Sequence, residues 1–150
     1  MPKDDRFLYE KKFMECQISI LMSGRIAEEL IFNEITSGAK NDFEKATEIA
    51  HSMVCELGMS KKMGPISYNK KNNELFLGRD FGKMSNFSEQ TAFYIDFEIK
   101  KIISFQYKKA SFLLKNNIKI LHKLAFILVK KETVSGDELL RIVNFFNIKK

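Results

Sequence analysis

The 150-residue sequence predicts a mainly α domain, a helical bundle of about five helices with one small β-hairpin. Two observations lead to this prediction. Apolar side chains recur at three- and four-residue steps in five segments, as they do on the buried side of a helix. Hydrophobic residues make up 45% of the chain and charged residues 29%, which is enough for one globular core and too little for two large domains.

The first predicted helix covers residues 7–32, where the apolar positions follow helical spacing. Gly24 interrupts this pattern. Because a glycine inside a helix costs about 1 kcal/mol relative to alanine, we expect another backbone to approach closely at this position. Residues 33–40 contain Ser37 and Gly38 and have no helical period, so they predict a loop.

The second predicted helix has the clearest apolar stripe, and both of its ends are marked. Asn41 followed by Glu44 resembles a capping box, and Gly58 suits a left-handed residue at the end of a helix. The stripe consists of Phe43, Ala46, Ile49, Ala50, Met53, Val54 and Leu57.

Residues 59–82 lose the helical period and predict the hairpin. Two short apolar runs, 66–68 and 75–77, flank a polar and turn-forming stretch at 69–73. Ser88 is a good N-cap for the long helix that follows. The predicted buried side of that helix comprises Ala92, Ile95, Ile99, Ile102, Ile103, Tyr107, Ala110 and Leu114.

Two more helices are predicted near the end of the chain. Asn116 and Asn117 break the long helix and begin a new one. Ser135 and Glu138 form a Ser-x-x-Glu capping box that opens a last short helix. The helix between these signals bears Leu121, Leu124, Ala125 and Leu128.

The charge distribution does not favour nucleic acid as a partner, although the net charge is +6. Lysines occur as scattered pairs along the whole chain, without the aromatic interleaving of a binding stripe, and so predict solvated helix faces and loop tips. A basic nucleic-acid-binding domain stays an alternative.

The apolar runs are shorter than the roughly 18 to 20 residues of a membrane-spanning helix. The charged N-terminus lacks the apolar core of a signal peptide. Cys16 and Cys55 form neither a disulfide scaffold nor a metal knuckle, which favours a reducing compartment.

Few residues of this chain have a pattern typical of catalysis. His51 follows Asp42 by nine residues, which at about 100° per residue places the two on opposite sides of one helix. His122 stands among lysines and leucine, and both histidines are interpreted as partly exposed helical residues. No serine or cysteine has a nucleophile context, and no glycine-rich run resembles a phosphate loop.

Asp42 and Glu28 are the two acidic residues that raise a question of function. Asp42 falls in line with Ala46, Ile49 and Met53, and a carboxylate turned toward a core is costly unless it is paired or binds a metal. Alternatively, a hydrated Asp42 interacts favourably with the dipole of the helix N-terminus. Glu28 lies three residues after Arg25, so an ion pair would explain it.

Several segments, in order, carry a family resemblance. They are Gly24–Phe32 (GRIAEELIF), Thr36–Thr47 (TSGAKNDFEKAT), Gly58–Ser60, Met63–Pro65, Leu75–Arg79 and Lys131–Thr133. Together they resemble the peptidase domain of FtsH, the family of membrane-anchored, ATP-dependent zinc metalloproteases, over nearly the whole chain.

The resemblance implies roles for both acidic residues. In that family two histidines of a His-Glu-x-x-His helix and an aspartate of an Asn-Asp pair hold zinc, which polarises the scissile carbonyl and activates water. The pair here is Asn41 and Asp42, so Asp42 is implied to be the third zinc ligand. Glu28 is implied to support the site by orienting a ligand.

The sequence also departs from the family, because it contains no His-Glu-x-x-His, no Walker phosphate loop and no transmembrane segment. We therefore expect residues 1–150 to be the C-terminal portion of an FtsH-like zinc peptidase domain. It would lack the histidine helix, the AAA+ ATPase domain and the membrane anchor. Zinc would bind only with the missing histidine pair, and ATP only elsewhere in the full-length protein. The isolated chain is expected to be inactive.

The resemblance further implies unfolded or membrane polypeptides as substrates and a homo-hexamer as the assembly. Anchorage to a bacterial cytoplasmic membrane or an organelle inner membrane would come from the missing segments, and this fragment alone would be soluble. The alternative from another functional class is a non-catalytic helical oligomerisation module.

Overall fold

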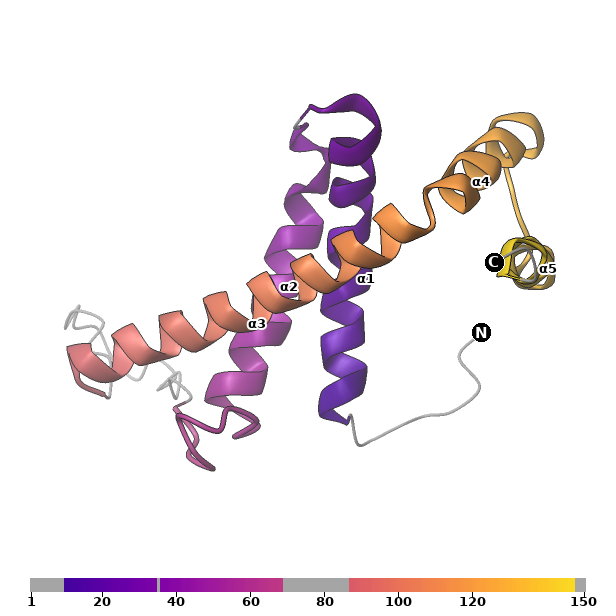
Figure 1. Ribbon diagram of the computed structural model, residues 1–150. Helices are drawn as coiled ribbons and strands as arrows, with labels where there is room; N and C mark the ends of the chain where they lie inside the picture. Colours follow the sequence, from indigo (N-terminus) through magenta and orange to yellow (C-terminus); the bar gives the residue numbers. More distant parts are fainter. Residues whose placement is uncertain (1–9, 35, 69–86, 148–150) are drawn as a thin grey trace, which may run out of the picture. The chain divides into compact units, whose positions relative to one another are not determined.

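A computed structural model describes residues 10–34, 36–68 and 87–147 (Figure 1). Within these ranges it has five α-helices, one short 3-10 helix and no strands, which confirms a mainly α fold. The chain divides into two compact units, residues 1–110 and 111–150, which are described separately. The elements are α1 (Lys11–Phe32), η1 (Ser37–Ala39), α2 (Lys40–Cys55), α3 (Glu89–Asn116), α4 (Ile118–Lys131) and α5 (Gly136–Asn147).

The first unit is built on α1 and α2, which lie side by side and are joined through η1 (Figure 1). Their shared core contains Ile18, Met22 and Ile26 from α1. From α2 it contains Ala46, Ala50 and Met53, and all six residues are at most 2% exposed. The two alanines leave room for the helices to pack closely. Each large apolar side chain buried here stabilises the fold by about 1.5–3 kcal/mol.

A second core cluster joins the end of α2 and the following segment to α3. Its buried members are Val54, Cys55, Met63 and Ile95. The Lys62 ammonium lies 4.2 Å from the ring centroid of Tyr94 and 5.2 Å from that of Phe97, both on α3. Cation–π contacts of this kind add to the apolar burial. The segment after α2 is therefore fixed against α3.

The second unit contains α4 and α5, whose contact includes an ion pair of 2.7 Å between Lys131 Nζ and Glu138 Oε1. Large apolar side chains stay exposed on these helices, among them Phe126, Val129, Leu140 and Phe145. None of the described helices combines the length and the apolar content needed to cross a bilayer.

Two predicted caps and one predicted break are confirmed. The Ser88 Oγ accepts a hydrogen bond from the Thr91 amide at 3.2 Å, and the Ser135 Oγ accepts one from the Glu138 amide at 3.2 Å. The long helix ends at Asn116 and the next begins at Ile118, so the break predicted at the asparagine pair is confirmed. The new cap predicted there is wrong, because the Asn117 side chain donates back to the Leu113 carbonyl at 2.9 Å and does not cap α4.

The predicted cap of the second helix is wrong. Asn41 lies inside α2, which begins at Lys40 after Ala39 and has no side-chain cap. The reason is that η1 leads directly into α2, so the Lys40 amide already donates to the Ser37 carbonyl. The capping side chain is Thr36, whose Oγ1 accepts from the Gly38 amide at 3.3 Å.

The hairpin is not seen in the described part of the chain. Residues 66–68 form no strand, and the Tyr68 amide instead donates to the Cys55 carbonyl at 2.6 Å. The other predicted strand at 75–77 and the turn at 69–73 lie outside the described residues. The first helix begins at Lys11, and residues 7–9 of its predicted range also lie outside them.

The two glycines singled out by the sequence differ in their surroundings. Gly58 has a φ of +59°, and a Cβ there would lie 3.0 Å from the Cα of Pro65. The left-handed conformation predicted for Gly58 is thus confirmed, although α2 ends earlier, at Cys55. A Cβ on Gly24 would meet no atom of another described segment within 4 Å. The close backbone approach predicted at Gly24 is therefore wrong.

These surroundings predict opposite effects for two alanine substitutions. Gly58→Ala should lower the free energy of unfolding by about 1–2 kcal/mol or more, because alanine is strained at positive φ and would press on Pro65. Gly24→Ala should raise it by about 0.5–1 kcal/mol, because alanine favours an uncrowded helix. Urea denaturation of the 150-residue chain measures both changes. Equal effects of the two substitutions would contradict this assignment.

Candidate functional site

Asp42 lies in the first turn of α2 with its side chain half-buried. Ala46 and Met53, which the helical wheel places on the same face, are fully buried. The Asp42 carboxylate forms no hydrogen bond or ion pair with another described residue. The partial positive charge at a helix N-terminus interacts favourably with a negatively charged group placed there. Asp42 thus holds a carboxylate at the edge of the core, where its oxygens could coordinate a metal ion.

Arg25 fixes the turn that leads into Asp42. This arginine on α1 is only 7% exposed. Its Nε lies 3.0 Å from Glu29 Oε1, and its Nη1 donates to the Thr36 carbonyl at 2.9 Å. The guanidinium also lies 5.9 Å from the ring centroid of Phe43, the residue after Asp42. A buried guanidinium needs such partners, so both sides of the turn are constrained by one side chain.

Glu28 reaches the same turn through Thr36. The Thr36 Oγ1 donates to Glu28 Oε2 at 2.9 Å while it accepts from the Gly38 amide at 3.3 Å. The predicted ion pair between Arg25 and Glu28 is not formed. Arg25 pairs with Glu29 instead, because Glu28 is turned toward Thr36. Glu28 therefore contacts the segment that carries Asp42 through a hydroxyl.

Glu29 also links α1 to α3, because the Tyr107 hydroxyl donates to its Oε2. Hydrogen bonds from Tyr107 and Arg25 lower the pKa of Glu29. Burial and the hydrogen bond to Glu29 raise the pKa of Tyr107 to about 12. At neutral pH Glu29 is therefore ionised and Tyr107 protonated, so the bond is of the strong charge-assisted kind. The sequence identified Tyr107 as a buried residue, but its helical spacing carried no signal for the hydroxyl.

The described residues do not by themselves fit a zinc site. Among them no group of three or more His, Cys, Asp or Glu side chains is placed to hold a metal ion. His51 and His122 are exposed. A catalytic zinc site uses three protein ligands and an open position. Asp42 offers one of these ligands, and a site built on it needs donors from outside these residues.

Comparisons with known proteins agree on one family. The family model for peptidase family M41 matches residues 1–142. The chain is 46% identical over 144 residues to the ATP-dependent zinc metalloprotease FtsH 1 of Thermoanaerobacter sp., covering 96% of this chain and 24% of that protein. It is 42% identical over 144 residues to the ATP-dependent zinc metalloprotease FtsH of Thermotoga maritima, with 96% and 24% covered.

A third relative, the ATP-dependent zinc metalloprotease FtsH 2 of Petrotoga mobilis, is 48% identical over 138 residues, with 92% of this chain and 22% of that protein covered. The chain thus spans about a quarter of the length of the curated relatives it matches.

The Tyr107→Phe substitution should show how much the hydrogen bond between Tyr107 and Glu29 contributes to the stability of the fold. Loss of this hydrogen bond should lower the free energy of unfolding by about 1 kcal/mol at pH 7. Because the folded pKa of Glu29 is lowered, its contribution is present above the ordinary carboxyl pKa and is lost as pH falls through the folded pKa. Urea denaturation should therefore show a difference between wild type and variant that shrinks at acid pH.

The contribution of Tyr107 to the free energy of unfolding changes in the opposite direction, because it is lost as pH rises. The raised pKa of Tyr107 stabilises the fold below about pH 10, and this stabilisation is lost as pH rises toward 12. Tyr94→Phe on the same helix is the control, since the Tyr94 hydroxyl makes no hydrogen bond to a described residue. A Tyr107→Phe difference that stays constant across pH would refute the charge-assisted bond.

Proposed function

The chain belongs to peptidase family M41, and from this membership we propose that it is the C-terminal portion of a zinc peptidase domain in which Asp42 completes the ligand set. The observation that carries the proposal is the half-buried Asp42 carboxylate, which has no hydrogen-bond or ion-pair partner among the described residues and directly follows a turn held by Arg25, Glu28 and Thr36. The helix dipole alone would suit a fully hydrated aspartate. It does not require this network around the turn.

The two further zinc ligands are proposed to be histidines of a His-Glu-x-x-His helix, a motif that is absent from these 150 residues. Zinc bound there would polarise the scissile carbonyl and activate water. Asp42 provides one anionic oxygen. Glu28 holds Thr36 and thereby the turn, which places it among the outer partners that orient a metal ligand.

The activity of the whole protein is part of this proposal. The relatives are named ATP-dependent zinc metalloproteases, which supports polypeptides as substrates and an ATPase domain elsewhere in the full-length chain. A homo-hexamer and a membrane anchor belong to the same proposal. The exposed apolar side chains of α4 and α5, including Phe126 and Phe145, support subunit contacts.

The proposal predicts that the 150-residue chain with zinc will not cleave an unfolded, fluorescently labelled protein. The chain joined to an upstream segment with the His-Glu-x-x-His helix and the ATPase domain should cleave it. In that complete protein Asp42→Asn should lower activity at least about 100-fold and release zinc, because an amide is a much poorer zinc ligand. Asp137→Asn, also in the first turn of a helix, is the matched control and should change neither. Retained zinc and activity in Asp42→Asn would reject the proposal.

Glu28 should affect the zinc affinity of the site without binding zinc itself. In the complete protein Glu28→Ala should weaken zinc binding about 10–100-fold, because the turn loses its hydrogen bond through Thr36. Glu28→Gln should recover most of this loss, since its amide oxygen can still accept from the Thr36 hydroxyl. Competition with a chelator of known affinity measures both. Glu34→Ala, an exposed residue of the same loop, is the control. No difference between Glu28→Ala and wild type would remove Glu28 from the site.

A further inference from the structure

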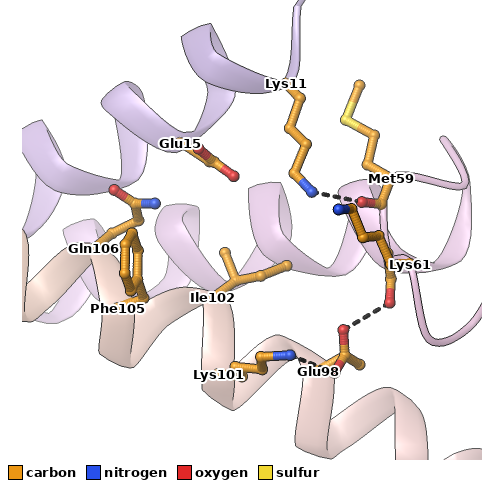
Figure 2. A pocket seen from close by; sticks show the side chains of 10 residues that line it. Lys11, Glu15, Met59, Lys61, Glu98, Lys101, Ile102, Phe105 and Gln106 are labelled. Atoms are coloured by element: carbon orange, nitrogen blue, oxygen red, sulfur yellow. Dashed lines mark hydrogen bonds and ion pairs between the residues drawn. The ribbon is translucent and has the colours of Figure 1, made fainter.

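The first unit contains a polar pocket at the end of α2 opposite to Asp42. Its walls come from the start of α1, the segment after α2 and the middle of α3 (Figure 2). Its volume is about 220 Å³. That is below the roughly 300 Å³ at which pockets begin to hold drug-sized ligands, so it suits a group the size of one amino acid.

Gln106 gives this pocket an unused hydrogen-bond donor. The side chain is 1% exposed, and its Oε1 accepts from the Ser19 Oγ at 3.0 Å. No described residue accepts from its Nε2, which faces into the pocket (Figure 2). Among the described residues, every side-chain N or O atom that is fully buried has a hydrogen-bond partner. Because Gln106 Nε2 has none, this nitrogen is not fully buried, and it is accessible from the pocket. A donor of this kind is strongly favoured to find an acceptor.

Lysine side chains line the same pocket. Glu98 is 5% exposed and accepts hydrogen bonds from Ser60 Oγ at 2.7 Å and Lys101 Nζ at 3.3 Å. Burial raises the pKa of Glu98, but these hydrogen bonds and the nearby lysines outweigh it and lower the pKa, so the carboxylate stays charged and holds Lys101. Lys11, whose Nζ donates to the Met59 carbonyl at 2.8 Å, and Lys61 also line the pocket. Donors for an anionic group are therefore gathered here.

The remaining wall is one acidic side chain and an apolar surface. Glu15 on α1 directs its carboxylate into the pocket (Figure 2). Met59, Ile102 and Phe105 supply the apolar part. An occupant that satisfies all of these groups carries a carboxylate, a neighbouring N–H donor and an apolar side chain.

We propose that this pocket binds the α-carboxylate and apolar side chain of an amino acid, either free or as the carboxy-terminal residue of a peptide. The carboxylate accepts from Gln106 Nε2 and from a lysine ammonium at the pocket. Glu15 accepts from the α-ammonium of a free amino acid or from the amide N–H of a peptide end. The apolar side chain packs on Ile102 and Phe105.

Binding to the 150-residue chain without zinc tests this proposal, so its outcome is independent of the metal site. The probes are leucine, leucine amide, a tetrapeptide that ends in leucine, and the same peptide with an amidated end. Calorimetry and side-chain amide NMR should show saturable binding with a Kd of about 1 mM or lower for at least one of the two acids. The better ligand identifies the source of the carboxylate. Each amide should bind at least about tenfold more weakly than its acid.

Variants separate the pocket from general charge effects. Lys61→Gln, at an exposed position, and Gln106→Met, which keeps the side-chain length, should each weaken binding about tenfold. Lys12→Gln removes the same charge outside the pocket and should leave the Kd unchanged. The proposal fails if neither acid binds at about 10 mM, if an amide binds as well as its acid, or if Lys12→Gln weakens binding as much as Lys61→Gln. If Gln106→Met does not fold, Lys61→Gln decides.

Discussion

The buried guanidinium of Arg25 is the constraint on which the arrangement around Asp42 depends. It is enclosed by the Glu29 carboxylate, the Thr36 carbonyl and the ring of Phe43. Leaving a guanidinium buried without partners would be strongly destabilising, so the turn between α1 and α2 has to meet it. The start of α2 is therefore held by an interaction with α1 in addition to the local hydrogen bonds of η1.

Polar links also align α3 with the rest of the first unit. Tyr107 donates to Glu29, Ser19 donates to Gln106, and Ser60 donates to Glu98. Each link joins segments that are far apart in the sequence, and each involves a buried or partly buried group. Apolar contacts are non-directional, whereas hydrogen bonds fix one arrangement. These three bonds fix how α3 packs in the first unit, and the one to Glu29 also supports the Arg25 side chain that holds the turn before Asp42.

Sequence patterns predicted what depends on local chemistry. The apolar stripes located the helices, and Ser88, Ser135 and the asparagine pair located their ends, because caps and breaks act within one helical turn. The position of Asp42 on the buried face of α2 also followed from helical spacing.

What the sequence could not predict depends on distant partners. Positions three and four residues after Arg25 lie on the same helix face, so only the location of Thr36 shows that Glu29 forms the ion pair. Glu98 and Gln106 interrupt the apolar face of α3, and their partners lie 38 and 87 residues away. Asn41 had the spacing of a cap, but the backbone of η1 satisfies the first amide of α2 in its place.

We propose that the first turn of α2, held in place by Arg25 of α1, presents the Asp42 carboxylate to a metal ion whose other ligands come from outside these 150 residues. A zinc-bound crystal structure of the chain joined to an upstream segment with a His-Glu-x-x-His helix tests this directly, with the metal located by its anomalous scattering. We expect an Asp42 oxygen at about 2.0–2.2 Å from zinc, beside two imidazole nitrogens. Zinc held without Asp42, with that carboxylate turned to solvent, would contradict it.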